Sequence, residues 1–270
     1  MTKPTGSIGF LQLVRERRTR DAIYHAKDYW DARATARTGL SRSLWPSNTY
    51  NALWDERQRD LIVRTLGNWS AHRMLDVGCG TGRMTRFLAS RGAKDVTGVD
   101  FSQATVVAAQ EETASVAEPW TKNTQFCTAD VLAGFSHLKM QFDDVLVLGC
   151  LSVACQSATD LALAFRNIAN AVSKGGRVLV LEPIHRSPLL RRVLDLGIEE
   201  WVSLANRADL ELVKADRMGF VPVRLVCSVR DVPQALVTPI FKAGETVLDR
   251  APFLAPLSDY KLLLFRKGAS

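Results

Sequence analysis

The chain has 270 residues, of which 47% are hydrophobic, and its 35 basic and 28 acidic residues give a formal net charge of +7. A chain of this length buries a full core without disulfides, and its five cysteines lack the C-x-x-C spacing of a metal site. No apolar stretch approaches the roughly 20 residues of a membrane span, and the N-terminus lacks the apolar run of a signal peptide. We therefore expect a cytoplasmic protein with reduced thiols, no metal and no membrane span.

The first 67 residues are basic and rich in aromatic side chains. Nine basic and four acidic residues precede residue 51, and residues 21–67 hold three of the six tryptophans and three of the four tyrosines. Such charge can attract nucleic acid, but no basic run is interleaved with stacking aromatics. We therefore favour the interpretation that these basic residues lie on the solvent-exposed face of a helix. The aromatic residues predict a lid over a pocket or, equally, a helical cap on the core. We assign residues 1–67 to an N-terminal helical lid and 68–270 to the main domain.

A glycine loop follows the first predicted strand. Residues 52–69 predict an amphipathic helix, and the stretch Arg-Met-Leu-Asp-Val-Gly-Cys-Gly-Thr-Gly at 73–82 predicts a buried strand, a tight loop and a new helix. Gly78, Gly80 and Gly82 have no Cβ, so a ligand can approach the backbone closely. Dinucleotide-binding sheets carry G-x-G-x-x-G, whereas the glycine spacing here is one residue tighter.

The next strands also end in polar or flexible residues. The second, at 95–100, is closed by Asp100, whose carboxylate can accept both hydroxyl hydrogens of a ribose. Phe101 follows it and can pack on an adenine face. A third strand at 124–131 contains a further acid, and a fourth at 142–148 leads into Gly149 at the sheet edge where open α/β sheets bind ligands.

The rest of the chain alternates helices and strands. A helix is predicted at 158–172, and a Gly-Gly turn then enters a fifth strand that ends at Glu182. The remaining predicted elements are a helix at 189–206, a strand at 221–229, a helix at 232–248 and a last strand at 260–266. This order completes seven strands.

From Asp76 to Gly82 the glycine segment resembles motif I of the class I S-adenosylmethionine-dependent methyltransferases, specifically the small-molecule, type 11 or ubiquinone-methyltransferase-like branch. The resemblance extends over residues 74–267, strongly in the cofactor half and loosely after His185. It implies an α/β fold with a seven-stranded, mostly parallel Rossmann-like sheet, helices on both faces and an N-terminal helical lid. It also implies S-adenosyl-L-methionine as the cofactor.

The resemblance assigns roles to individual residues. In this family the acid of the third strand receives the adenine amino group and the next residue packs on the ring, which points to Asp130 and Val131. The implied cofactor-binding residues are Asp76, Gly78, Cys79, Gly80, Gly82, Asp100, Phe101, Asp130, Val131, Gly149 and Tyr29.

A sulfonium methyl group is already activated, so the enzyme mainly aligns donor and acceptor and excludes water, with no metal and no covalent nucleophile. A hydroxyl acceptor is helped by a general base, and histidine suits this role near neutral pH. His185, after the fifth strand, and His25, in the aromatic segment, are the candidate catalytic residues. A structural role for each is the stronger alternative.

We predict methyl transfer to a small-molecule acceptor, most simply O-methylation of a sugar, polyketide or other secondary metabolite. The alternatives are an RNA methyltransferase and a C-methyltransferase of a quinone or lipid. Base-methylating relatives carry an Asp/Asn-Pro-Pro-aromatic loop after strand four, where this chain has Gly149-Cys150-Leu151-Ser152, so a nucleic-acid partner is not expected. The intact acids Asp76, Asp100 and Asp130 argue against a catalytically idle binding module. The tight glycine spacing argues against a nicotinamide dehydrogenase. The oligomeric state stays open.

Overall fold

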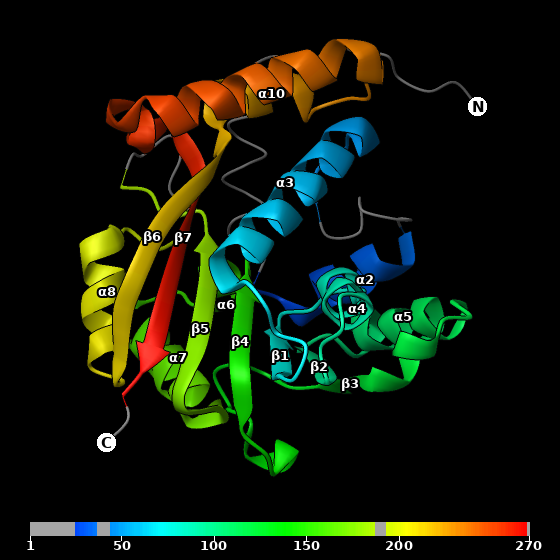
Figure 1. Cartoon of the computed structure of the whole chain (residues 1–270), viewed down its shortest axis with the longest axis vertical. Coiled ribbons are helices and arrows are strands. Elements are labelled where there is room, and N and C mark those ends of the chain that lie inside the picture. Colours follow the sequence, from blue (N-terminus) through cyan, green and yellow to red (C-terminus); the bar gives the residue numbers. More distant parts are fainter. Residues whose placement is uncertain (1–24, 37–43, 187–192, 269–270) are drawn as a thin grey trace.

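The computed structural model describes residues 25–36, 44–186 and 193–268, and it is built on one seven-stranded sheet (Figure 1). The strand order is β3-β2-β1-β4-β5-β7-β6. Neighbours from β3 to β5 run parallel, whereas β7 is antiparallel to both β5 and β6. The expected mostly parallel α/β sheet is therefore confirmed. The strands are β1 (Arg73–Val77), β2 (Asp95–Asp100), β3 (Thr124–Thr128), β4 (Phe142–Leu148), β5 (Val172–Glu182), β6 (Leu210–Phe220) and β7 (Ser258–Lys267).

Helices cover both faces of this sheet (Figure 1). They are α2 (Lys27–Ala36), α3 (Asn48–Leu66), α4 (Arg83–Ser90), α5 (Gln103–Ala114), α6 (Leu151–Ala154), α7 (Ala158–Ala171), α8 (Ile198–Asn206), α9 (Val221–Cys227) and α10 (Gln234–Arg250). Short 3-10 turns occur at Pro119–Asn123, Ser136–Leu138 and Pro252–Leu257. One apolar core lies between the sheet and α7 and α8, and a second lies between the sheet and α3, α4 and α10.

Local sequence signals explain where several helices begin. Ser47 caps α3 by accepting a hydrogen bond from the Tyr50 amide, and Ser102 caps α5 by accepting one from the Thr105 amide. Ser157 and Asp160 form a reciprocal capping box at the start of α7. These caps satisfy amide donors that have no acceptor within their own helix.

The predicted position of the sixth strand is wrong. Residues 221–229, predicted as a strand, contain α9, and the strand β6 precedes it at Leu210–Phe220. β6 is an edge strand with most of its middle residues exposed, so it lacks the apolar run of a buried strand. Pro222 fits the first turn of a helix, where its missing amide hydrogen is not needed. The predicted helix at 189–206 begins only at Ile198, and residues 187–192 lie outside the described ranges.

The N-terminal segment contributes to the core. Trp54 and Ile62 of α3 are almost fully buried against the sheet, in the same cluster as Met74 of β1. The Trp54 ring fills the space beside Gly219, where a Cβ would lie 2.3 Å from the ring. The boundary between 67 and 68 stays a prediction. No helix within the described ranges combines the length and the apolar character that crossing a membrane requires.

An ionic cluster clamps the amino-terminal edge of the sheet. The Asp144 carboxylate at the start of β4 is fully buried and accepts hydrogen bonds from Nε and Nη2 of Arg177, at 2.5 and 2.8 Å. The His72 Nδ1 lies 2.6 Å from the same carboxylate. Arg177 also donates to the Leu66 carbonyl at the end of α3, at 2.7 Å. One side chain therefore ties α3, β4 and β5 together.

Replacing Asp144 with alanine should lower the free energy of unfolding by about 2 kcal/mol or more, because the Arg177 guanidinium loses its acceptor in a half-buried position. Urea unfolding followed by circular dichroism measures this change. The matched control is Asp95→Ala, which removes an exposed pair with Arg73 at 3.8 Å and should change stability by less than about 0.5 kcal/mol. Equal effects of the two substitutions would contradict the clamp.

Candidate active site

Two hollows lie at opposite edges of the sheet. A cavity of about 290 Å³ lies at the carboxyl ends of β1, β2 and β4, and we call it the carboxyl-edge cavity. It is lined by His25, Trp30, Ala34, Val77, Gly78, Gly80, Thr81, Asp100, Phe101, Thr105, Ala129, Asp130, Val131, Leu132, Leu148, Gly149, Cys150, Val153, Ala154 and Gln156. It therefore combines the glycine loop, the strand-end acids and α2.

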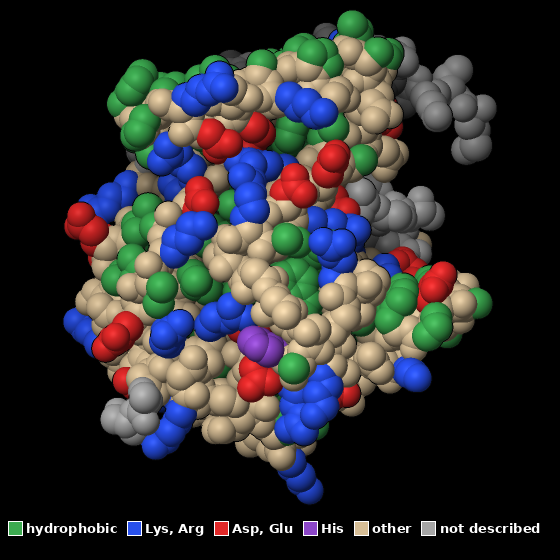
Figure 2. Space-filling view, in the orientation of Figure 1, with side chains coloured by type: hydrophobic (Ala, Val, Ile, Leu, Met, Phe, Trp, Pro, Cys, Tyr) green, Lys and Arg blue, Asp and Glu red, His purple; other side chains and the backbone are tan. Residues whose placement is uncertain are grey.

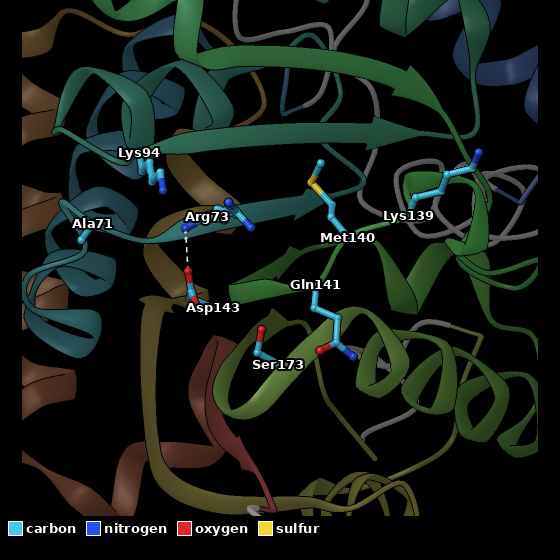
Figure 3. Close-up of a pocket in the computed structure, with 8 residues that line it drawn as sticks. All are labelled: Ala71, Arg73, Lys94, Lys139, Met140, Gln141, Asp143 and Ser173. Carbon is cyan, nitrogen blue, oxygen red and sulfur yellow. Dashed lines mark hydrogen bonds between the residues drawn. The ribbon is translucent and has the colours of Figure 1, made fainter.

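The other hollow is a groove of about 580 Å³ at the amino ends of the strands (Figure 3). Arg73 begins β1 on its wall, and its amide donates to the Asp143 carboxylate at 2.8 Å. Lys94 and Lys139 also line it. In parallel sheets ligands bind outside the carboxyl ends of the strands, so this groove is the less suitable of the two. The described part of the chain contains no cluster of three or more side chains suited to hold a metal ion.

The glycine loop presents bare backbone to the carboxyl-edge cavity. Gly78 and Gly80 have φ angles of +71° and +56°, which L residues with a Cβ rarely adopt. A Cβ on Gly78 would lie 2.6 Å from the Cys150 Cβ. The amides of Gly78 and Cys79 both donate to the Val99 carbonyl of β2, at 2.8 and 3.0 Å. The loop is therefore anchored to the neighbouring strand and leaves room for a ligand.

Asp100 connects the acid at the end of β2 to this loop. Its carboxylate accepts hydrogen bonds from the Gly80 and Ser102 amides, each at 3.0 Å. Burial raises the pKa of Asp100, and the two amides oppose that rise. A carboxylate offers about four acceptor positions, so those that the backbone amides leave unused can accept from ligand hydroxyls. The predicted ribose ligand thus lies on the cavity wall.

Asp130, Val131, Phe101 and Gly149 also line this cavity, and their contact with the cofactor stays a prediction. The Asp130 carboxylate accepts from the Leu132 amide at 2.8 Å, which fixes the turn after β3. Phe101 and Val131 supply the apolar surfaces that a flat ring requires.

Four other predicted cofactor residues do not line the cavity. Asp76 is buried beneath the loop, where it accepts a hydrogen bond from the Thr85 hydroxyl at 2.7 Å, and burial raises its pKa to about 6. Cys79 is buried as well, and Gly82 packs against the Phe126 ring. Tyr29 accepts a hydrogen bond from Arg33 at 2.9 Å. Asp76, Cys79 and Gly82 therefore contact other parts of the protein around the glycine loop, and Tyr29 contacts Arg33 within α2.

The comparisons with known proteins agree with this geometry. A family model described as a methyltransferase domain matches residues 74–176. A ubiquinone biosynthesis O-methyltransferase of Pseudomonas fluorescens (strain Pf0-1) is 30% identical over 185 residues, which cover 67% of this chain and 75% of the relative. Its counterpart in Aeromonas salmonicida (strain A449) is 27% identical over 194 residues, covering 70% and 77%. The chain belongs to the class I S-adenosylmethionine-dependent methyltransferases.

Solved structures share the fold of this methyltransferase. The magnesium protoporphyrin IX methyltransferase of Synechocystis PCC 6803 with bound SAM matches with a TM-score of 0.57 at 14% identity, over 98% of this chain and 100% of the other. The [4+2]-cyclase SpnF matches with a TM-score of 0.61 at 18% identity, over 95% and 96%. Because one neighbour is named as a cyclase, the fold alone does not settle the chemistry.

The helix α2 closes one side of the methyltransferase cavity. Trp30 and Ala34 line it, and the Arg33 guanidinium lies 5.4 Å from the Trp30 ring centre, within range of a cation–π contact. Asp31 accepts a hydrogen bond from the Ser102 hydroxyl at the start of α5. Within the described residues, the predicted lid therefore reaches the cavity through His25, Trp30 and Ala34 and is attached near Asp100 through Asp31.

The two candidate catalytic histidines occupy different surroundings in the methyltransferase. His25 is exposed and lines the cavity. His185 is buried, its Nε2 lies 2.8 Å from the Asp259 carbonyl, and burial lowers its pKa to about 4. His185 is not among the lining residues of the cavity, so the geometry favours His25 of the two.

Sequence reasoning placed the exit of β4 at Gly149 beside the pocket but missed the lining residues that follow it. Val153 and Ala154 belong to the short helix α6 and line the cavity, and Gln156 follows them on the same wall. A four-residue helix leaves no periodic pattern in a sequence, so no signal could have revealed it.

Gly78→Ala should weaken binding of S-adenosylhomocysteine at least about tenfold, because the new methyl collides with Cys150 and displaces the turn on the cavity wall. Isothermal calorimetry measures the affinity. The matched control is Gly175→Ala, which has a φ of +70° but no atom within 4 Å of the new Cβ. This control should lose about 1 kcal/mol of stability and keep its affinity. Unchanged affinity in Gly78→Ala would argue against the close approach of a ligand to this loop.

Proposed function

We propose that this methyltransferase transfers a methyl group to a hydroxyl oxygen of a small organic acceptor. The observation that carries the proposal is that one cavity is lined both by the glycine loop with Asp100 and by apolar side chains that include Trp30. The first part fits an adenosine and the second fits a carbon skeleton. The names of the curated relatives, ubiquinone biosynthesis O-methyltransferases, support oxygen as the accepting atom.

The residues present fit S-adenosylmethionine. Gly78 and Gly80 line the cavity with backbone alone, Asp100 would offer acceptor positions to the ribose, and Asp130 with Val131 would hold the adenine. When bound, the cofactor supplies a methyl group already activated by its sulfonium. The chain's own residues hold that group in place and exclude water, which are the main tasks in such a transfer.

The wall beyond the cofactor residues suits an apolar, flat acceptor. Trp30, Leu132, Leu148 and Val153 line it, and Gln156 is a polar exception. A sugar would leave its hydroxyl groups facing apolar side chains without hydrogen-bond partners. An aromatic or polyketide-type acceptor with one reactive hydroxyl therefore fits better than a sugar.

His25 is the candidate general base. Its imidazole lines the cavity from the chain segment before α2, where it can accept the proton that the acceptor hydroxyl loses as the new oxygen–carbon bond forms. We also propose that residues 1–67 act as the lid, because α2 brings both His25 and Trp30 to the acceptor side. Basic and acidic side chains are interspersed over the face shown in Figure 2, which supports a small molecule over a nucleic acid.

The proposal is tested by incubating the protein with methyl-labelled S-adenosylmethionine and a panel of acceptors, with mass spectrometry locating the label. Phenols, hydroxylated polyketides, sugars, a quinone lacking a free hydroxyl, and transfer RNA form the panel. Label on the oxygen of a phenol or polyketide supports the proposal. Label on quinone carbon, with none on oxygen, would instead indicate a C-methyltransferase. Label on RNA alone would indicate an RNA methyltransferase.

His25→Ala should lower kcat roughly 100-fold for the best acceptor, because the hydroxyl proton loses its acceptor, while S-adenosylhomocysteine affinity stays unchanged. The control is His137→Ala, an exposed histidine in the turn before β4, which should leave kcat unchanged. His185→Ala should lower the unfolding temperature, since its hydrogen bond to the Asp259 carbonyl is buried. Full activity of His25→Ala would remove this histidine from the mechanism.

A further inference from the structure

A buried acid on β5 holds the turn that follows β4. The Glu182 side chain is fully buried at the carboxyl end of its strand. Its carboxylate accepts hydrogen bonds from three successive backbone amides, those of Cys150 at 2.7 Å, Leu151 at 2.8 Å and Ser152 at 3.2 Å. These amides begin α6, which has only four residues and few acceptors of its own.

This turn is part of the wall of the carboxyl-edge cavity. Gly149 and Cys150 line the cavity, and the Gly149 amide donates to the Leu181 carbonyl of β5 at 2.9 Å. Cys150 also limits the space beside Gly78, where a Cβ would lie 2.7 Å from the Cys150 sulfur. The turn therefore packs directly against the glycine loop, and the two together border the cavity.

Only a carboxylate suits this arrangement. It has about four acceptor positions on two oxygens, enough for three amides, whereas a glutamine has two on one oxygen and would direct its own N–H groups at the remaining donors. Burial raises the pKa of Glu182 to about 7, and the hydrogen bonds from this turn oppose that rise because they favour the charged form. No part of the apolar core requires an acid at this position.

We propose that Glu182 is a positioning residue of the cofactor site, which fixes the 149–152 turn against the glycine loop and thereby sets the affinity for S-adenosyl compounds. The inference rests on the proposed function, because it names the support of that same site. Glu182 itself does not line the cavity and acts through Gly149 and Cys150.

The test compares Glu182→Gln with Glu245→Gln. Glu245 is also a buried acid that caps backbone amides, since it accepts from Gly219 at 2.9 Å and Phe220 at 3.2 Å. It lies on α10 and does not line the cavity, so its replacement removes a buried carboxylate from two amides, and from Arg57 at 2.8 Å, without touching the site. Binding of S-adenosylhomocysteine is measured by calorimetry, thermal unfolding is measured in parallel, and amide hydrogen exchange is followed at residues 150–152.

We expect Glu182→Gln to weaken S-adenosylhomocysteine binding about tenfold or more and to speed exchange at 150–152. Glu245→Gln should lower the unfolding temperature by a similar amount yet keep its affinity. Equal affinity in wild type and Glu182→Gln, or an equal loss in Glu245→Gln, would overturn the inference. If Glu182→Gln does not fold, Glu182→Asp replaces it, with weaker binding again expected and wild-type binding overturning the role. Absence of binding by the wild type would instead contradict the cofactor assignment.

Discussion

Backbone amides at the carboxyl edge of the sheet need acceptors, and carboxylates at the ends of the strands supply them. Asp100 accepts from the Gly80 and Ser102 amides, and Glu182 accepts from three amides of the turn after β4. Both acids are at least partly buried, so bulk water cannot replace them freely. The loops that face the cavity are therefore shaped by charged groups whose nearest partners are backbone atoms. The cofactor site depends on this arrangement before any ligand arrives.

The aromatic residues of the N-terminal segment have two different roles, in the core and at the cavity, which the amino-acid composition alone does not distinguish. Trp54 of α3 is a core residue, since its ring packs 5.1 Å from the Tyr260 ring of β7 and fills the space left by Gly219. Trp30 of α2 instead lines the cavity. The same segment thus completes one face of the sheet and covers the ligand side. Within the described residues α2 therefore borders the cavity, whereas α3 belongs to the core.

The fold and the site carry different kinds of information about function. The match to a [4+2]-cyclase and to a porphyrin methyltransferase at similar TM-scores shows that this sheet hosts unlike chemistry. What distinguishes this chain is local, namely the glycine loop, the acid at the end of β2 and the apolar wall beneath Trp30. That wall comes from α2 and from the segment after β4. Neither belongs to the glycine-loop motif.

The sequence by itself determined the cofactor half of the fold. The second and fourth strands were predicted at 95–100 and 142–148, the bounds that the structure shows, because each has a buried interior containing β-branched residues. The edge strand β6 was missed since exposure removes that pattern. Only the tertiary structure decided that Asp76 faces Thr85 while Asp100 faces the cavity, and that Glu182 reaches amides 30–32 residues earlier. Spacing along a chain fixes local backbone geometry, but which partner a buried carboxylate meets depends on how distant strands are placed side by side.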